Sequence, residues 1–299
     1  KTRWAGRLDS LPELADPTAR AVLWSAAWDA TRDAELSTED FVELTAAVLP
    51  YETDASVYAE MMRQVISVAV GQYLPPQARD RALRSLARAC GRTPVEAGAD
   101  RRLAAARGLA RCGGPADLDW LDGGGPAGVE VDAELRWLAL NRLVVLGAAG
   151  TAQIEAEAER DRSAPGREHA ARCRAARPDP DAKAAAWESI VDGAGLSQRL
   201  LLATAGGFWQ PEHEELTREY VPRYFTELPT LADRYTPQLL GWLAVAAYPR
   251  FAVEPDTEAA ARRLLEHDGL PAGLRRAVAD GTDDLRRALA ARARTAAPA

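Results

Sequence analysis

The stretch DPTARAVLWSAAWDA, residues 16–30, carries a complete helix signal and guides the interpretation of the rest of the chain. Asp16 and Pro17 are typical of the cap and first residue of a helix, because a proline there gives up an N–H that has no partner anyway. Apolar residues then recur at the i, i+3, i+4, i+7 spacing that places them on one face. They are Ala19, Val22, Leu23, Ala26, Ala27 and Ala30. The stretch therefore predicts an amphipathic α-helix.

Comparable patterns recur along the whole chain with short turns between them, while the residues that favour strands are sparse. They predict helices at about 41–49, 54–73, 77–90, 100–112, 132–146, 151–161, 166–176, 181–192, 212–226, 236–247, 257–267, 271–279 and 282–294. Ser37 with Asp40 fits a capping box before the first of these helices, and Thr236-Pro237 is a good start for the helix at 236–247. Amphipathic helices of this length are not stable alone and must pack on their neighbours. We therefore expect an all-α fold, an α–α superhelix of antiparallel helix pairs of the HEAT or armadillo type. A four-helix bundle is the alternative for any third of the chain.

We expect residues 1–299 to form one domain with an internal flexible point at 123–128, where three glycines precede a proline. This segment lacks the Lys-Ser/Thr pair of a phosphate-binding loop, so we interpret it as a linker. The chain begins at Lys1, and its only methionines are Met61 and Met62. Because an open reading frame starts with Met, we expect the chain to be part of a longer protein or a trimmed product.

Charge and hydropathy narrow the range of partners. The formal net charge of −7 argues against a nucleic-acid partner, which favours a basic surface. The longest runs without charge, 64–78 and 235–249, fall short of the roughly 20 residues of a membrane span, so we expect no membrane partner. The three cysteines are odd in number and far apart, which favours free thiols in a reducing cytoplasm.

A search for catalytic patterns finds no site. His169, His213 and His267 lie more than forty residues apart, and no H-E-x-x-H pair occurs, so we expect no metal and no cofactor in this chain. Cys173 follows His169 by four residues on a predicted helix. That spacing suits either a catalytic Cys–His pair or, more simply, a core thiol beside a surface imidazole.

The stretch GGFWQPEHEELTREYVPRYFTELP, residues 206–229, concentrates aromatic side chains in a chain that is otherwise poor in them. These are Phe208, Trp209, Tyr220, Tyr224 and Phe225. Aromatic residues dominate the energetics of cores and interfaces, so the stretch predicts either a packing joint or a binding surface.

Several blocks together resemble the C-terminal helical domain of an actinobacterial aminopeptidase N, and the resemblance spans nearly all of the chain. The blocks are LWSAAWD (23–29) leading to RDAELS (32–37), ALNRL (139–143), KAAAW (183–187), GFWQP (207–211) and YVPRYF (220–225). The resemblance implies a zinc metallopeptidase that removes single residues from peptide N-termini. Its H-E-x-x-H zinc motif and G-A-M-E-N substrate loop would lie in a preceding catalytic domain. Neither motif occurs here, so no catalytic residue is carried over and this chain alone is expected to be inactive.

The resemblance also implies that the helical domain closes over the catalytic domain and lines the cavity that holds a peptide substrate. Zn²⁺ would belong to the parent's catalytic domain, and that domain and the peptide are the expected partners. Within this picture Trp209, Arg223 and Tyr224 are candidates for the cavity surface. Arg223 suits a peptide carboxylate because a guanidinium can form two parallel hydrogen bonds with it. The alternative is that Phe208, Trp209, Tyr220 and Phe225 fill a joint between helical pairs.

Two other functions stay open from the sequence. One is a stand-alone helical-repeat scaffold that binds a protein partner. The other is a self-contained hydrolase that uses Cys173 and His169. If a catalytic domain normally covers the cavity face, the isolated chain should expose apolar surface there and self-associate.

Overall fold

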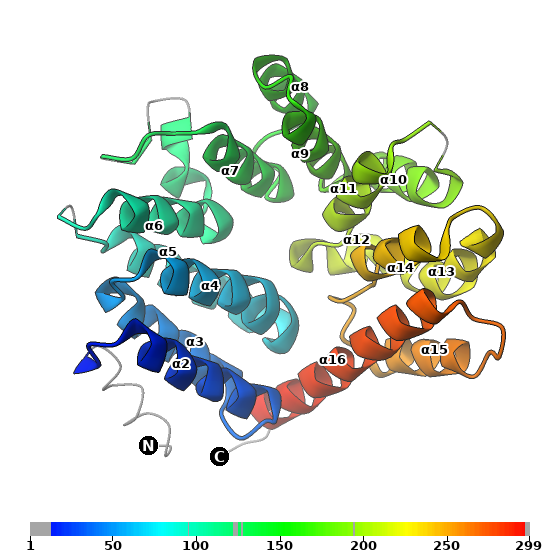
Figure 1. The fold of residues 1–299 in the computed structure, drawn as a ribbon, viewed down its shortest axis with the longest axis horizontal. Coiled ribbons are helices and arrows are strands. Elements are labelled where there is room, and N and C mark those ends of the chain that lie inside the picture. The colour runs from blue at the N-terminus through cyan, green and yellow to red at the C-terminus, as the bar shows by residue number, and fades with distance from the viewer. Residues whose placement is uncertain (1–12, 95, 122–124, 127, 194, 297–299) are drawn as a thin grey trace. The chain divides into compact units, whose positions relative to one another are not determined.

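The computed structural model describes residues 13–94, 96–121, 125–126, 128–193 and 195–296 (Figure 1). These ranges contain α-helices, short 3₁₀-helices and one π-helix, and no strand occurs in them. The all-α prediction is therefore confirmed. The chain divides into two compact units: a first unit, Lys1–Arg142 with Arg287–Ala299, and a second unit, Leu143–Arg286.

Helices of the first unit pack on their near neighbours in the sequence. It contains α2 (Pro17–Arg32), α3 (Thr38–Val48), η2 (Leu49–Tyr51), α4 (Ala55–Gln64), the π-helix η3 (Val65–Tyr73), α5 (Pro76–Gly91), α6 (Ala99–Cys112), η4 (Pro115–Asp117), η5 (Asp119–Leu121) and most of α7 (Ala133–Val145). Helix α3 packs on α5 and α4 packs on α6, while α5 also packs on α6 (Figure 1). Contacts with the next helix and the next but one are typical of stacked helical pairs.

Helices of the second unit also pack on near neighbours in the sequence, but their lengths differ from those in the first unit. It contains α8 (Thr151–Arg160), α9 (Ala164–Ala175), α10 (Pro180–Asp192), α11 (Gln198–Phe208), η6 (Pro211–His213), α12 (Glu214–Thr217), α13 (Tyr220–Glu227), η7 (Leu228–Asp233), α14 (Pro237–Ala246), α15 (Pro255–Leu265) and the first part of α16 (Ala272–Ala296). Helix α11 packs closely on α9 and also on α10 and α14, so it is central to this unit.

Local capping chemistry explains where several helices begin. The Asp16 carboxylate accepts from the Thr18 N–H at 3.0 Å, and the Ser37 hydroxyl accepts from the Asp40 N–H at 3.0 Å. At α14 the Thr236 hydroxyl accepts from the Leu239 N–H at 3.3 Å. Each bond satisfies a helical N–H that has no partner within the helix. The predicted starts at Asp16-Pro17, Ser37 and Thr236-Pro237 are confirmed.

Two predictions about helices near glycines were wrong. No helix was predicted over α11, and a break was predicted inside α16. In α11, a Cβ on Gly207 would lie 2.3 Å from the Arg172 carbonyl oxygen, so this glycine allows α11 to approach α9. In α16, a Cβ on Gly281 would lie 2.7 Å from the Tyr248 ring. Both glycines permit close packing and do not end their helices.

Two further segments differ in detail from their predictions. The predicted helix 54–73 forms, but its second half is the π-helix η3. The predicted helix 212–226 is divided into η6, α12 and α13. Half of the predicted flexible point at 123–128 lies outside the described residues, and its flexibility stays a prediction. The two units divide between Arg142 and Leu143.

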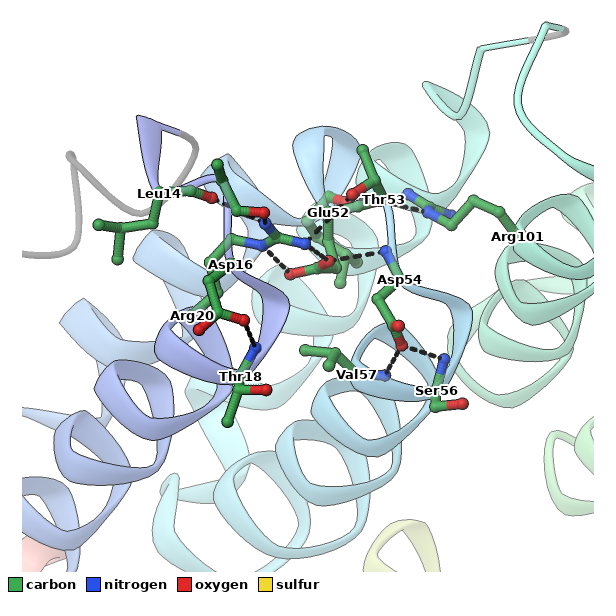
Figure 2. A network of polar contacts seen from close by, with 12 residues as sticks. Leu14, Asp16, Thr18, Arg20, Glu52, Thr53, Asp54, Ser56, Val57 and Arg101 are labelled. Carbon is green, nitrogen blue, oxygen red and sulfur yellow. Dashed lines mark hydrogen bonds and ion pairs between the residues drawn. The ribbon is translucent and has the colours of Figure 1, made fainter.

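A buried ion pair joins α2 to the turn before α4 in the first unit (Figure 2). Arg20 donates from Nε to Glu52 Oε2 at 2.9 Å and from Nη2 to Glu52 Oε1 at 2.6 Å. Its Nη1 donates to the Leu14 carbonyl at 2.7 Å. Both side chains are buried. Bidentate hydrogen bonding of this kind is typical of a guanidinium and a carboxylate. Together with the bond to Leu14, it holds the segment before α2 against the turn.

Glu52 and Arg101 extend this network into the start of α4 and into α6. Glu52 Oε1 also accepts from the Asp54 N–H at 2.8 Å, and Asp54 in turn caps α4 (Figure 2). Arg101 donates from Nε to the Glu52 carbonyl at 2.6 Å and from Nη2 to the Leu49 carbonyl at 2.9 Å. The Leu49 carbonyl also accepts from the Glu52 N–H at 3.2 Å, so Arg101 adds a second donor there and ties α6 to the turn before α4.

Among the residues that the structure describes, no helix is both long enough and apolar enough to cross a bilayer.

Candidate functional site

The aromatic stretch identified in the sequence forms a packed cluster in the second unit. Phe208 lies 4.9 Å from Trp209 and 5.1 Å from Tyr220, measured between ring centroids, and 5.2 Å from Trp187 of α10. Two of these pairs, Phe208 with Trp209 and with Tyr220, meet edge to face, an arrangement that aromatic quadrupoles favour, and the third is tilted. The prediction that Phe208, Trp209, Tyr220 and Phe225 pack between helices is confirmed, since all four are buried in one core.

Trp209 and Tyr224, two of the three candidates for a cavity surface, lie within this core. The Trp209 indole donates to the Ala247 carbonyl at 2.6 Å, and the Tyr224 hydroxyl donates to the Ala244 carbonyl at 2.8 Å. Tyr224 has no exposed surface, and Trp209 has 5%. Both polar atoms thus donate hydrogen bonds to backbone carbonyls near the end of α14. In this structure neither side chain offers appreciable surface to a ligand.

Arg223, the third candidate, has an exposed side chain above the aromatic cluster. Its Nε donates to Glu227 Oε1 at 2.7 Å, and its Nη2 lies 3.4 Å from Glu227 Oε2. The guanidinium carbon lies 5.2 Å from the Tyr220 ring centroid and 5.6 Å from that of Trp187. The side chain is 44% exposed. We call Arg223, Glu227, Trp187 and Tyr220 the Arg223 cluster.

Arg223 and Glu227 stabilise each other's charged forms. The Trp187 indole donates to Glu227 Oε2 at 2.8 Å. Burial alone would raise the pKa of the Glu227 carboxyl, but the hydrogen bonds from Arg223 and Trp187 and the charge of Arg223 lower it overall. The bond to Glu227 likewise raises the pKa of Arg223. Both groups are therefore ionised at neutral pH, and the guanidinium has one edge engaged with Glu227.

One nitrogen of the Arg223 guanidinium is not engaged with Glu227. Within the described residues, Nη1 of Arg223 makes no hydrogen bond. An incoming carboxylate could accept from Nη1 and the outer N–H of Nη2, which have the fork geometry that such anions prefer. The negative charge of Glu227 opposes this binding, so the site suits a weakly held and exchangeable anion.

Lys183 is a buried amine beneath the aromatic cluster that the sequence analysis did not single out. It is fully buried on α10 and donates from Nζ to the Ala175 carbonyl at 2.7 Å and to the Phe208 carbonyl at 2.6 Å. These are the last residues of α9 and α11. Lys183 therefore caps two helices at once, where the helix dipole also favours a cation. Burial lowers the pKa of Lys183 to about 7.

His213 does not lie on the helix that carries the Cys173 and His169 candidates. His213 is buried, with Nε2 at 2.8 Å from the Val145 carbonyl oxygen. Cys173 is buried in α9, and His169 lies one turn earlier on the same helix. In the part of the chain that the structure describes, no three His, Cys, Asp or Glu side chains come together as metal ligands.

A shallow groove of about 220 Å³ lies between α3 and α5 in the first unit. Arg81 stands beside it and pairs with Glu43 at 2.9 Å and with Glu39 at 3.6 Å. The walls include the buried side chains of Val42 and Leu74. Because its charges pair with one another, the groove does not concentrate charge of one sign.

Apolar side chains are exposed at a few positions. On α14, Trp242 is 49% exposed and Val245 is 54% exposed, three residues apart on the same face. Val22 and Tyr51 are exposed in the first unit. The expected self-association of the isolated chain is untested and stays a prediction.

Comparison with known proteins gives two matches. A sequence model of the family described as "ERAP1-like C-terminal domain" matches residues 1–287. A protein described as aminopeptidase N from Streptomyces lividans is 38% identical over 299 residues, which cover 97% of this chain and 35% of that relative. The chain thus spans about a third of the length of the curated relative that it matches.

Proposed function

The chain belongs to the ERAP1-like C-terminal domain family, and we propose from this that it is the non-catalytic C-terminal domain of a zinc-dependent aminopeptidase. The observation that carries the proposal is the match to an aminopeptidase N along nearly all of this chain but only 35% of the relative. The H-E-x-x-H motif is absent from this sequence, so the zinc ion and the catalytic residues would belong to a preceding domain. The family match does not favour a stand-alone scaffold.

In this proposal the helical domain closes over the catalytic domain and lines the cavity that receives the peptide. The parent enzyme would hydrolyse N-terminal residues from peptides. Its location would be the cytoplasm, in keeping with three free and buried cysteines. The catalytic domain and the peptide are the partners that this role requires.

The function is tested by comparing this chain with the product of the full coding sequence. We expect an H-E-x-x-H motif in the frame upstream of Lys1, and hydrolysis of aminoacyl amides by the longer product that a zinc chelator abolishes. This chain alone should give no turnover. An in-frame stop codon close upstream of Lys1 would contradict the proposal. So would turnover by this chain that is lost in Cys173→Ser or His169→Ala.

Arg223 supplies a finer test of the peptide cavity. We expect Arg223→Ala in the longer enzyme to raise KM about 5–10-fold for peptides with a free C-terminal carboxylate, because a hydrogen bond to a charged group contributes about 1.5–3 kcal/mol before solvent screening. Amidated peptides should keep their KM. The measurement is steady-state kinetics on matched free and amidated peptides.

The matched control for this variant is Arg218→Ala, which removes another exposed arginine of the second unit that pairs with a nearby glutamate, Glu215. It should leave both KM values unchanged. An equal effect of Arg223→Ala on both peptides, or no effect on either, would exclude Arg223 as a carboxylate contact. The proposed function itself would survive that result.

A further inference from the structure

Two cysteines of the first unit meet at a single glycine. Cys112, the last residue of α6, lies with Sγ at 3.2 Å from the Gly108 carbonyl oxygen. A Cβ built on Gly108 would lie 3.1 Å from Cys90 Sγ, which projects from α5. The missing side chain at position 108 therefore lets the sulfur of Cys90 approach the same residue of α6 that the sulfur of Cys112 contacts.

The surroundings of the pair distinguish the two thiols. The Tyr58 hydroxyl donates to Cys90 Sγ at 3.2 Å, and the guanidinium carbon of Arg101 lies 3.6 Å from the Tyr58 ring centroid. The neighbouring Cys112 thiol has the largest effect on Cys90 and lowers its pKa. Burial raises the pKa of Cys90, while the hydrogen bond from Tyr58 and the charge of Arg101 lower it further. The neighbouring Cys90 thiol and burial both raise the pKa of Cys112. Cys90 is therefore the more acidic thiol and Cys112 the one that keeps its proton.

We propose that Cys90 and Cys112 are a reversible oxidation site that forms a disulfide with a hydroperoxide as the oxidant. The Cys90 thiolate attacks one peroxide oxygen, the O–O bond breaks, and the departing hydroxide takes a proton to give water. The sulfur of Cys112 then attacks the resulting Cys90 sulfenic acid. The S–S bond forms, the S–O bond breaks, and the second hydroxide leaves as water with the Cys112 proton. Two thiols and one hydrogen peroxide thus give one disulfide and two waters.

Burial sets the rate of this reaction. Cys90 is 4% exposed and Cys112 is 3% exposed, and buried thiols react slowly with large reagents. Hydrogen peroxide is small and uncharged, so a brief local opening of α5 and α6 is enough to admit it. Cys173 lies in the second unit and has no other cysteine in that unit. It serves as an internal control.

The test is a thiol count on the full chain after treatment with hydrogen peroxide. The peroxide is removed with catalase, the protein is unfolded in guanidinium chloride, and its thiols are counted with Ellman's reagent. We expect the three thiols of the chain to fall to one, and dithiothreitol to restore all three. Trypsin should release residues 89–92 linked to residues 112–136, and mass spectrometry identifies this pair without any variant.

Single replacements of each cysteine locate the bond. Cys173→Ser should fall from two thiols to none, and Cys90→Ser should keep two, because it lacks the thiolate that attacks the peroxide. Cys112→Ser should stop at the sulfenic acid of Cys90 and form no disulfide. The proposal is overturned if three thiols persist in the wild-type chain. It is equally overturned if oxidation yields sulfonic acids, or a sulfoxide at the neighbouring Met62, without the linked peptides.

Discussion

Glu52→Gln is expected to lower the free energy of unfolding of the first unit by about 3–5 kcal/mol. The glutamine carbonyl can still accept from one nitrogen of Arg20, but its amide group presents donors to the other. The guanidinium then stays buried with its charge uncompensated, because Glu52 is the carboxylate that holds it from 2.6 and 2.9 Å. Urea denaturation followed by circular dichroism should show the midpoint falling by about 1–3 M.

An exposed pair in the same unit provides the control for this experiment. Glu60 and Arg63 form an ion pair on α4 with both side chains more than half exposed. Glu60→Gln should therefore change the free energy of unfolding by less than about 1 kcal/mol. A double variant, Arg20→Met with Glu52→Leu, should be more stable than Glu52→Gln alone, since it removes both charges. Glu52→Gln within 1 kcal/mol of the parent would show that the pair contributes little.

Lys183 is expected to make the stability of the second unit depend on pH between about 7 and 10.5. Its pKa is about 7 in the folded chain and returns to the ordinary value of 10.5 on unfolding. In this window the unfolded state binds more protons than the folded state, so the free energy of unfolding rises with pH. Each unit of pKa corresponds to about 1.4 kcal/mol, which gives about 3–5 kcal/mol across the window. Below pH 7 this dependence stops, because both states are protonated.

Lys183→Met isolates this contribution from the other titrations of the chain. The variant leaves the carbonyls of Ala175 and Phe208 without their donor, at a cost of about 1–3 kcal/mol each. We expect it to be less stable than the parent at pH 10 and about as stable at pH 6. Urea denaturation of both proteins across this range measures the difference.

The titration can also be observed directly. The chain contains only two lysines, Lys1 and Lys183, so labelling with ¹³C-lysine gives two side-chain signals, and Lys183→Met identifies one of them. A Lys183 signal that titrates near pH 10 would contradict the expectation. So would parallel stability curves for the parent and the variant.

The sequence predicted those features that depend on neighbouring residues. Caps at Asp16, Ser37 and Thr236 act within three residues, so their helices began where expected. Helix α11 and the continuity of α16 were not predicted, because the residues that Gly207 and Gly281 contact, Arg172 and Tyr248, are more than thirty positions away. A glycine that ends a helix and one that admits a neighbouring helix look alike in a single sequence.

The same limit applies to charged residues in the core. Arg20 and Glu52 are 32 positions apart, and the helical pattern assigns charged residues to the solvent face. For Lys183 a signal was available: it is one of two lysines in a chain with 37 basic residues, so its type is unusual here. Arg223 was identified from the sequence because it lies within the aromatic stretch. Its ion pair with Glu227 is visible only in the structure.

The burial of Lys183 has a consequence for chemical labelling. Reagents that acylate lysine have at most two targets in this chain, and one of them is enclosed by α9, α10 and α11. Acylation of that amine requires those helices to separate. The rate of Lys183 acylation, measured by mass spectrometry without any substitution in the chain, therefore reports how often the core of the second unit opens transiently.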